Sequence, residues 1–158
     1  MTTVLLAIDE TDAAHFAALT AVSLFGPDAT YLAVHVEPAA HGSTPRWGPI
    51  YGYPYPPVPV VSAMRLDGGA GTQDAINDAR LVAAQQVAAL GVDAAPVGEV
   101  GDPATAIGAV ASEHDVDVVV LGAHQRGWFG RLFDDSVVDD LRRVSEVPLL
   151  VVPEPDLG

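Results

Sequence analysis

Five short runs of mainly apolar residues, separated by segments with helix signals, constrain the fold of this chain more than any other feature. The runs are TVLLAI (3–8), TYLAVHV (30–36), AAPVGEV (94–100), DVVVLG (117–122) and VPLLVV (147–152). Strands that are apolar along their whole length are typical of a parallel sheet covered on both faces. Their alternation with helices indicates consecutive βα units. The sequence therefore predicts a doubly wound α/β fold with five parallel strands.

The segments between these runs carry signals for helix starts and ends. Thr11 can cap a helix that continues to Phe25. A second helix is predicted to begin at Thr72 and to end before Gly91, and Asp102 is a natural cap for a third. The segment 136–144 predicts a short fourth helix. Helices are thus expected after the first, second, third and fourth strands.

The length of 158 residues predicts a single domain over 1–158, and no internal repeat is present. Residues from 38 to about 70 are rich in proline and aromatic side chains, which predicts a long loop. Three interpretations of this loop stay open. It folds over a binding site as a lid, presents a docking surface, or is an insertion without a partner.

The net charge of −14, from 7 basic and 21 acidic residues, excludes nucleic acid and anionic membranes as partners. The apolar runs are too short to span a bilayer, and the N-terminus lacks a secretory pattern, so a cytoplasmic location is expected.

Cysteine is absent, which excludes disulfides and thiol catalysis. His35, His41 and His124 have no spacing typical of a zinc site, so no metal site is predicted. No nucleophile is paired with an evident base, and the chain is not expected to be an enzyme.

Sheets of this class bind ligands beyond the carboxyl ends of their strands, where the strand order reverses. The first strand is expected to end in Asp9, and the fourth in Gly122 and His124. If these strands are neighbours, both ends face one cleft. A second interpretation of Asp9 is an anion that stabilises the start of the first helix, and the two roles are compatible.

Five segments in order resemble the universal stress protein family over nearly the whole chain. They are VLLAIDETDAA (4–14), LAVHV (32–36), GEVGDPATAI (98–107), DVDVVVLGAH (115–124) and SVVDDLRRVSEVPLLVV (136–152). The resemblance implies an adenine nucleotide alpha hydrolase-like fold, with strand order 3-2-1-4-5 and helices on both faces. It also implies a regulatory, stress-response homodimer. One branch of this family binds ATP and another does not.

The resemblance also implies positions for a nucleotide and for a dimer contact. The nucleotide, ATP or AMP with Mg²⁺, is expected against Ala7, Ile8, Asp9, Val36, Gly122, His124, Gln125, Arg126, Gly127, Ser136 and Val137. The dimer is expected to form through the last strand, at Leu149, Leu150, Val151 and Val152. An exposed apolar strand at a sheet edge is an aggregation hazard, which is an independent reason to expect that it is covered.

The chain departs from the motif of the ATP-binding branch, which is Gly, two residues, Gly, nine residues, then Gly followed by Ser or Thr. Gly122 and Ser136 match this motif, but Gln125 and Asp135 replace its other two glycines. Two like charges about 4 Å apart repel by about 4 kcal/mol in a surface cleft, so Asp135 disfavours a triphosphate. Two arginines and two further glycines of the same loop, or a divalent cation, could offset this repulsion. The sequence therefore leaves two functions open: a degenerate adenine-nucleotide site, or a protein-interaction module of the same fold whose cleft Asp135 closes.

Overall fold

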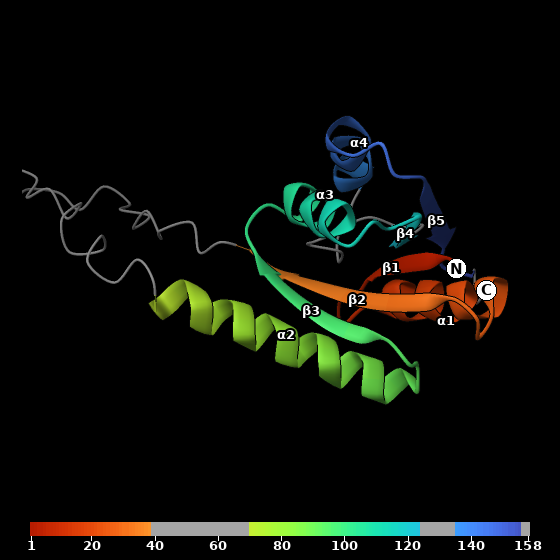
Figure 1. Cartoon of the computed structure of the whole chain (residues 1–158), viewed down its shortest axis with the longest axis horizontal. Coiled ribbons are helices and arrows are strands. Elements are labelled where there is room, and N and C mark those ends of the chain that lie inside the picture. Colours follow the sequence, from red (N-terminus) through yellow and green to blue (C-terminus); the bar gives the residue numbers. More distant parts are fainter. Residues whose placement is uncertain (39–69, 124–134, 156–158) are drawn as a thin grey trace, which may run out of the picture.

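A parallel sheet of five strands lies at the centre of this computed structural model, which describes residues 1–38, 70–123 and 135–155 (Figure 1). The strands are β1 (Thr3–Ala7), β2 (Thr30–Glu37), β3 (Ala95–Val100), β4 (Val118–Ala123) and β5 (Leu149–Pro153). The helices are α1 (Asp12–Phe25), α2 (Ala70–Leu90), α3 (Pro103–Glu113) and α4 (Asp135–Val144). The strand order is β3-β2-β1-β4-β5, and every neighbouring pair is parallel. The predicted fold class and strand order are confirmed.

Two helices cover each face of the sheet (Figure 1). Leu5, Val34 and Leu121 point to the face that packs against α3 and α4. Leu6 and Val120 point to the opposite face, against α1 and α2. Alternate residues of each central strand therefore enter different halves of the core, which explains why these strands are apolar along their whole length.

Two helix starts are held by the caps that the sequence indicates. The hydroxyl oxygen of Thr11 accepts a hydrogen bond from the backbone N–H of Ala14 at 3.2 Å, in the first turn of α1. Asp102 accepts from the backbone N–H of Thr105 at 2.9 Å and from its hydroxyl at 2.8 Å. These two bonds lower the pKa of Asp102 below its ordinary value, because they stabilise the ionised carboxylate.

Two glycines allow a helix backbone to lie directly on the sheet. A Cβ atom at Gly122 of β4 would lie 2.7 Å from the backbone nitrogen of Ala14, and closer still to the carbonyl group of Ala13. A Cβ atom at Gly98 of β3 would lie 2.8 Å from Cα of Arg80, on α2. No side chain fits at either position without moving the helix away.

The structure differs from the sequence expectations at several element ends. Helix α2 begins at Ala70, two residues before the predicted start at Thr72, and α4 begins one residue early at Asp135. Strand β4 is described as far as Ala123, and His124 lies outside the described residues. The predicted loop lies outside the described residues over 39–69. Among the described helices, none is long and apolar enough to cross a membrane.

Candidate functional site

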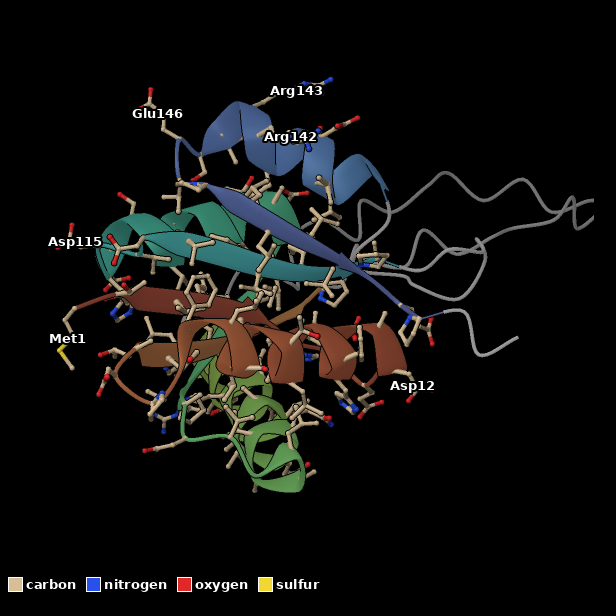
Figure 2. The ribbon with its side chains drawn as sticks, turned by 90° about the vertical axis from the view of Figure 1, so that its right-hand side faces the viewer. Met1, Asp12, Asp115, Arg142, Arg143 and Glu146 are labelled. Atoms are coloured by element: carbon tan, nitrogen blue, oxygen red, sulfur yellow. The ribbon has the colours of Figure 1, made fainter. Side chains whose placement is uncertain are left out.

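The strand order reverses between β1 and β4, and the chain leaves the sheet there at Asp9. Ala7 of β1 is paired with Val34 of β2 on one side, and Leu6 is paired with Val120 of β4 on the other. Continuing the second register by two residues brings Gly122 level with Ile8. Figure 2 shows Asp12, at the start of α1, at the end of the sheet toward which β4 and β5 run. The expected neighbour relation of the first and fourth strands is confirmed, and Asp9 and Gly122 lie at one edge of the sheet.

The carboxylate of Asp9 is buried at this edge, with 6% of the residue exposed. Its Oδ1 atom accepts hydrogen bonds from the backbone N–H of Thr11 at 2.8 Å and from the Thr11 hydroxyl. Thr11 in turn caps α1, so Asp9 supports the start of that helix. Within the described part of the chain, the second carboxylate oxygen, Oδ2, has no hydrogen-bond partner. A buried acceptor with an unsatisfied oxygen is uncommon and is a natural contact for a donor on a ligand.

His35 of β2 is the other buried polar residue of the described core, with 6% of it exposed. Its Nδ1 atom lies 3.1 Å from the carbonyl oxygen of Ile8, the residue before Asp9. Because a carbonyl oxygen can only accept, Nδ1 carries the proton. Its Nε2 atom lies 3.7 Å from the carboxylate of Glu37, whose side chain is 57% exposed. We find no group of three or more metal-binding side chains in the ranges that the structure describes.

Three apolar residues expected beside the nucleotide are core residues of this sheet. Ala7 and Val36 are buried in the half of the core that contacts α3 and α4. Ile8 is buried in the other half, against α1 and α2. Their side chains are explained by packing without a ligand. Val137, in the first turn of α4, is partly buried against the same core as Ala7.

Gly122 has a structural role that sequence reasoning missed. From the sequence, this glycine is expected beside the nucleotide, as the first glycine of the ATP-binding motif. In the structure, the group that lies against Gly122 is the first turn of α1, at Ala13 and Ala14. The close contact brings the α1 start, with Thr11, against the end of β4. The sequence signal for this role is the alanine pair at 13–14 in a helix with a small-residue face.

Glu99 of β3 is a titratable residue at this edge that no sequence motif indicates. It is paired in register with Val36 and is half-buried. Burial, and in second place the charge of Glu113, raise the pKa of Glu99 above its ordinary value of 4.5. Ionised Glu99 therefore destabilises the folded chain, which is a cost that a solvated surface carboxylate does not carry.

Several predicted site residues lie outside what the structure describes. They are His124, Gln125, Arg126 and Gly127, in the segment 124–134. Asp135 and Ser136 are the first two residues of α4, but their side chains are not described. The dimer residues are placed on β5, which is an edge strand. Leu149, Leu150 and Val151 are partly buried, and Val152 is buried against the α1 side of the sheet.

Comparison with known proteins gives one family and a set of solved structures. A family model described as the universal stress protein family matches residues 1–153. A hypothetical protein, MJ0577, superposes with a TM-score of 0.60 at 18% identity, covering 98% of this chain and 97% of that one. A universal stress protein in complex with cAMP gives 0.52 at 20% identity, with 96% and 95% covered. A universal stress protein family protein from Arabidopsis thaliana with AMP bound gives 0.54 at 15% identity, with 99% and 94% covered. No curated protein matches the chain.

Proposed function

The chain belongs to the universal stress protein family, and from this premise we propose that it is a regulatory homodimer that binds an adenine nucleotide without turning it over. The nucleotide lies across the carboxyl edge of β1 and β4. Adenosine monophosphates, AMP or cAMP, are its preferred ligands, and the chain acts in the cytoplasm. The observation that carries the proposal is the buried Asp9 carboxylate, whose Oδ2 atom has no hydrogen-bond partner among the described residues.

The position of Asp9 supports a nucleoside as the ligand. A carboxylate accepts hydrogen bonds strongly, and ribose hydroxyls and the adenine amino group are donors. The site lies at the reversal of strand order, where sheets of this class bind their ligands. One structure with the same fold is in complex with cAMP, and another has AMP bound. The ligand class in our proposal follows from these observations taken together.

The preference for a monophosphate comes from the start of α4. In the ATP-binding motif of the family, a glycine precedes the serine, whereas this chain has Asp135 there, as the first residue of α4. A carboxylate at a helix start competes with phosphate for the same N–H groups and partial positive charge. A triphosphate brings more negative charge to this position than a monophosphate does. The binding of a triphosphate is therefore weakened more than the binding of a monophosphate, unless a divalent cation lies between the charges.

Isothermal titration with AMP, cAMP and ATP, with and without Mg²⁺, tests this proposal. The variant Asp9→Asn keeps an acceptor for Thr11 but can place an amide NH₂ where Oδ2 lies. We expect it to weaken AMP binding by roughly 10- to 100-fold, since a hydrogen bond to a charged group is lost. Asp12→Asn, an exposed change in the first turn of α1, is the matched control. Absence of saturable binding by the unchanged protein would refute the proposed ligand.

A second variant tests the role assigned to Asp135. Asp135→Gly restores the glycine of the motif and removes one negative charge from the start of α4. We expect it to strengthen ATP binding more than AMP binding. An equal effect on both nucleotides would show that the repulsion is not specific to the longer phosphate chain. Measurement of released phosphate or ADP in the same samples tests the absence of turnover, and product formation above background would contradict it.

The dimer is proposed through the open edge of β5. The carbonyl of Pro148 and the N–H of Glu154 bond to β4, at 2.9 and 3.0 Å. Because successive residues of a strand present their backbone groups to alternate sides, those of Leu149 and Val151 face away from β4. These groups can pair with the same strand of a second copy. An antiparallel pairing of this kind would extend the sheet across both protomers.

Val151→Pro removes one outward N–H while leaving the bonds to β4 in place, since proline is tolerated at this kind of edge position. We expect it to shift the protein from dimer to monomer in analytical ultracentrifugation. Val151→Ala keeps the N–H and is the control for the lost side chain. A monomeric unchanged protein, or a dimeric Val151→Pro variant, would count against pairing through β5.

One observation favours a second function, a protein-interaction module without a nucleotide. Asp135 is the first residue of α4, and a negative charge in the first turn of a helix occupies the partial positive charge that a phosphate would need. In that case the segment 45–58 would contact the partner. Deletion of this segment would then abolish capture of a partner while leaving the melting temperature unchanged. Unchanged capture would exclude that segment as the contact.

A further inference from the structure

Ile8, the last residue before Asp9, is held by β2 through both of its backbone groups. Its N–H donates to the carbonyl oxygen of Val34 at 2.9 Å. Its carbonyl oxygen accepts from Nδ1 of His35 at 3.1 Å, in a buried environment. The first bond continues the pairing of β1 with β2, whose last register pair is Ala7 with Val34. The second bond comes from a side chain.

We infer that His35 is a positioning residue, which sets the orientation of the Asp9 carboxylate through the Ile8 carbonyl. The inference rests on the proposed nucleotide site. The carbonyl of Ile8 and the N–H of Asp9 belong to one planar peptide group. A hydrogen bond that fixes the direction of the carbonyl therefore also fixes the orientation of the backbone N–H of Asp9, next to the carbon atom that carries its side chain. From there Oδ1 reaches Thr11 and Oδ2 is left for the ligand. A rigid support of this kind reduces the conformational freedom lost when a ligand binds.

The geometry separates the two nitrogens of the imidazole ring. Nδ1 makes the contact with Ile8, whereas Nε2 lies 3.7 Å from an exposed glutamate, beyond hydrogen-bond distance. An ion pair with a carboxylate that is more than half exposed contributes little to stability. The positioning role therefore belongs to Nδ1, and Glu37 is not needed for it.

Two isosteric substitutions distinguish these nitrogens. Asparagine places its amide nitrogen where Nδ1 of histidine lies, and so His35→Asn can keep the donor to Ile8. Glutamine places its amide group near Nε2, and His35→Gln leaves the Ile8 carbonyl without this donor. Glu37→Gln removes the contact of Nε2 and leaves Nδ1 unchanged. Glu37 is exposed, so this third variant is expected to fold.

The first readout is hydrogen exchange of the Thr11 amide, followed by NMR in protein without nucleotide. This amide donates to Oδ1 of Asp9 at 2.8 Å and reports the orientation of the carboxylate directly. We expect exchange roughly tenfold faster in His35→Gln, from loss of one buried hydrogen bond, and near the unchanged rate in His35→Asn and Glu37→Gln. Equal acceleration in His35→Asn and His35→Gln would overturn the inference. So would an unchanged rate in His35→Gln.

The second readout is AMP affinity by isothermal titration. We expect roughly tenfold weaker binding in His35→Gln and recovery in His35→Asn. If both His35 variants bind AMP weakly while their melting temperatures stay similar, the loss of affinity comes from removal of the imidazole ring itself. This result would overturn the role of Nδ1. If the unchanged protein binds no AMP, the proposed function fails. The Thr11 exchange rates still decide whether His35 positions Asp9.

Discussion

Replacement of Gly122 by alanine tests whether this glycine serves the packing of α1 or the binding of phosphate. The added Cβ would lie 2.7 Å from the backbone nitrogen of Ala14 and closer to the Ala13 carbonyl group. Ordinary contact distances are about 3.5 to 4 Å, so α1 would have to retreat by about 1 Å. The helix packs five buried alanines against the sheet, and a shift of this size weakens their contacts. We expect Gly122→Ala to lower the free energy of unfolding by about 2 to 3 kcal/mol.

Urea denaturation followed by circular dichroism measures this change, and a thermal melt should show a fall of roughly 5 to 10 °C. Gly71→Ala is the control, because Gly71 lies in the first turn of α2 with no atom within 4 Å of an added Cβ. It should leave stability unchanged or raise it by up to about 1 kcal/mol. If Gly122→Ala instead unfolds like the unchanged protein and loses only nucleotide binding, the packing argument is wrong.

Three further changes test individual contacts. Burial and the charge of Glu113 raise the pKa of Glu99. Glu99→Gln should therefore raise the free energy of unfolding at pH 7, measured by urea denaturation. This gain should disappear as the pH falls toward 4.5, because Glu99 is then protonated in the unchanged protein. A gain that persists at pH 3 would contradict this. The pKa of Asp102 is lowered, so its contribution is present at pH 7 and is lost as the pH falls below 3.8. Asp102→Ala should cost about 1 kcal/mol at pH 7 and much less in acid, while Asp102→Asn should keep most of the cap. Tyr31→Phe removes the hydroxyl that donates to the Gly26 carbonyl at 2.7 Å, and should lower the unfolding free energy by about 1 kcal/mol in the same assay. No loss would show that solvent satisfies this carbonyl equally well.

Local signals in the sequence identified the elements well but their ends less well. Thr11 and Asp102 cap the helices as predicted, because a capping side chain acts on amides within three residues of itself. Gly91 ends α2 with a φ of 65°, which glycine adopts readily. The start of α2 at Ala70 carries no such signal, and the prediction at Thr72 was two residues late. A helix end without a strong capping signal in the sequence depends on packing and is hard to locate.

Some features of the candidate site could also be predicted from the sequence, and others could not. The place of Asp9 at a strand end could be inferred, since the apolar run before it predicts a strand buried on both faces. The role of His35 could not, because its partner, the Ile8 carbonyl, is 27 residues away along the chain. The raised pKa of Glu99 could not be predicted either, since it depends first on burial of this side chain. Both properties depend on contacts with residues that are distant in the sequence, and no local sequence pattern indicates them.

The sequence by itself determined the class of fold and the order of its elements, because apolar periodicity and capping act over a few residues. The family came from the resemblance of five segments in order. The tertiary structure alone decided why Gly122 has no side chain and which atoms hold Asp9 in place. Both answers depend on where α1 and β2 lie against the ends of β1 and β4. Packing brings backbone atoms from distant parts of the chain within a few ångströms of each other, and it is at that range that steric exclusion and hydrogen bonding act.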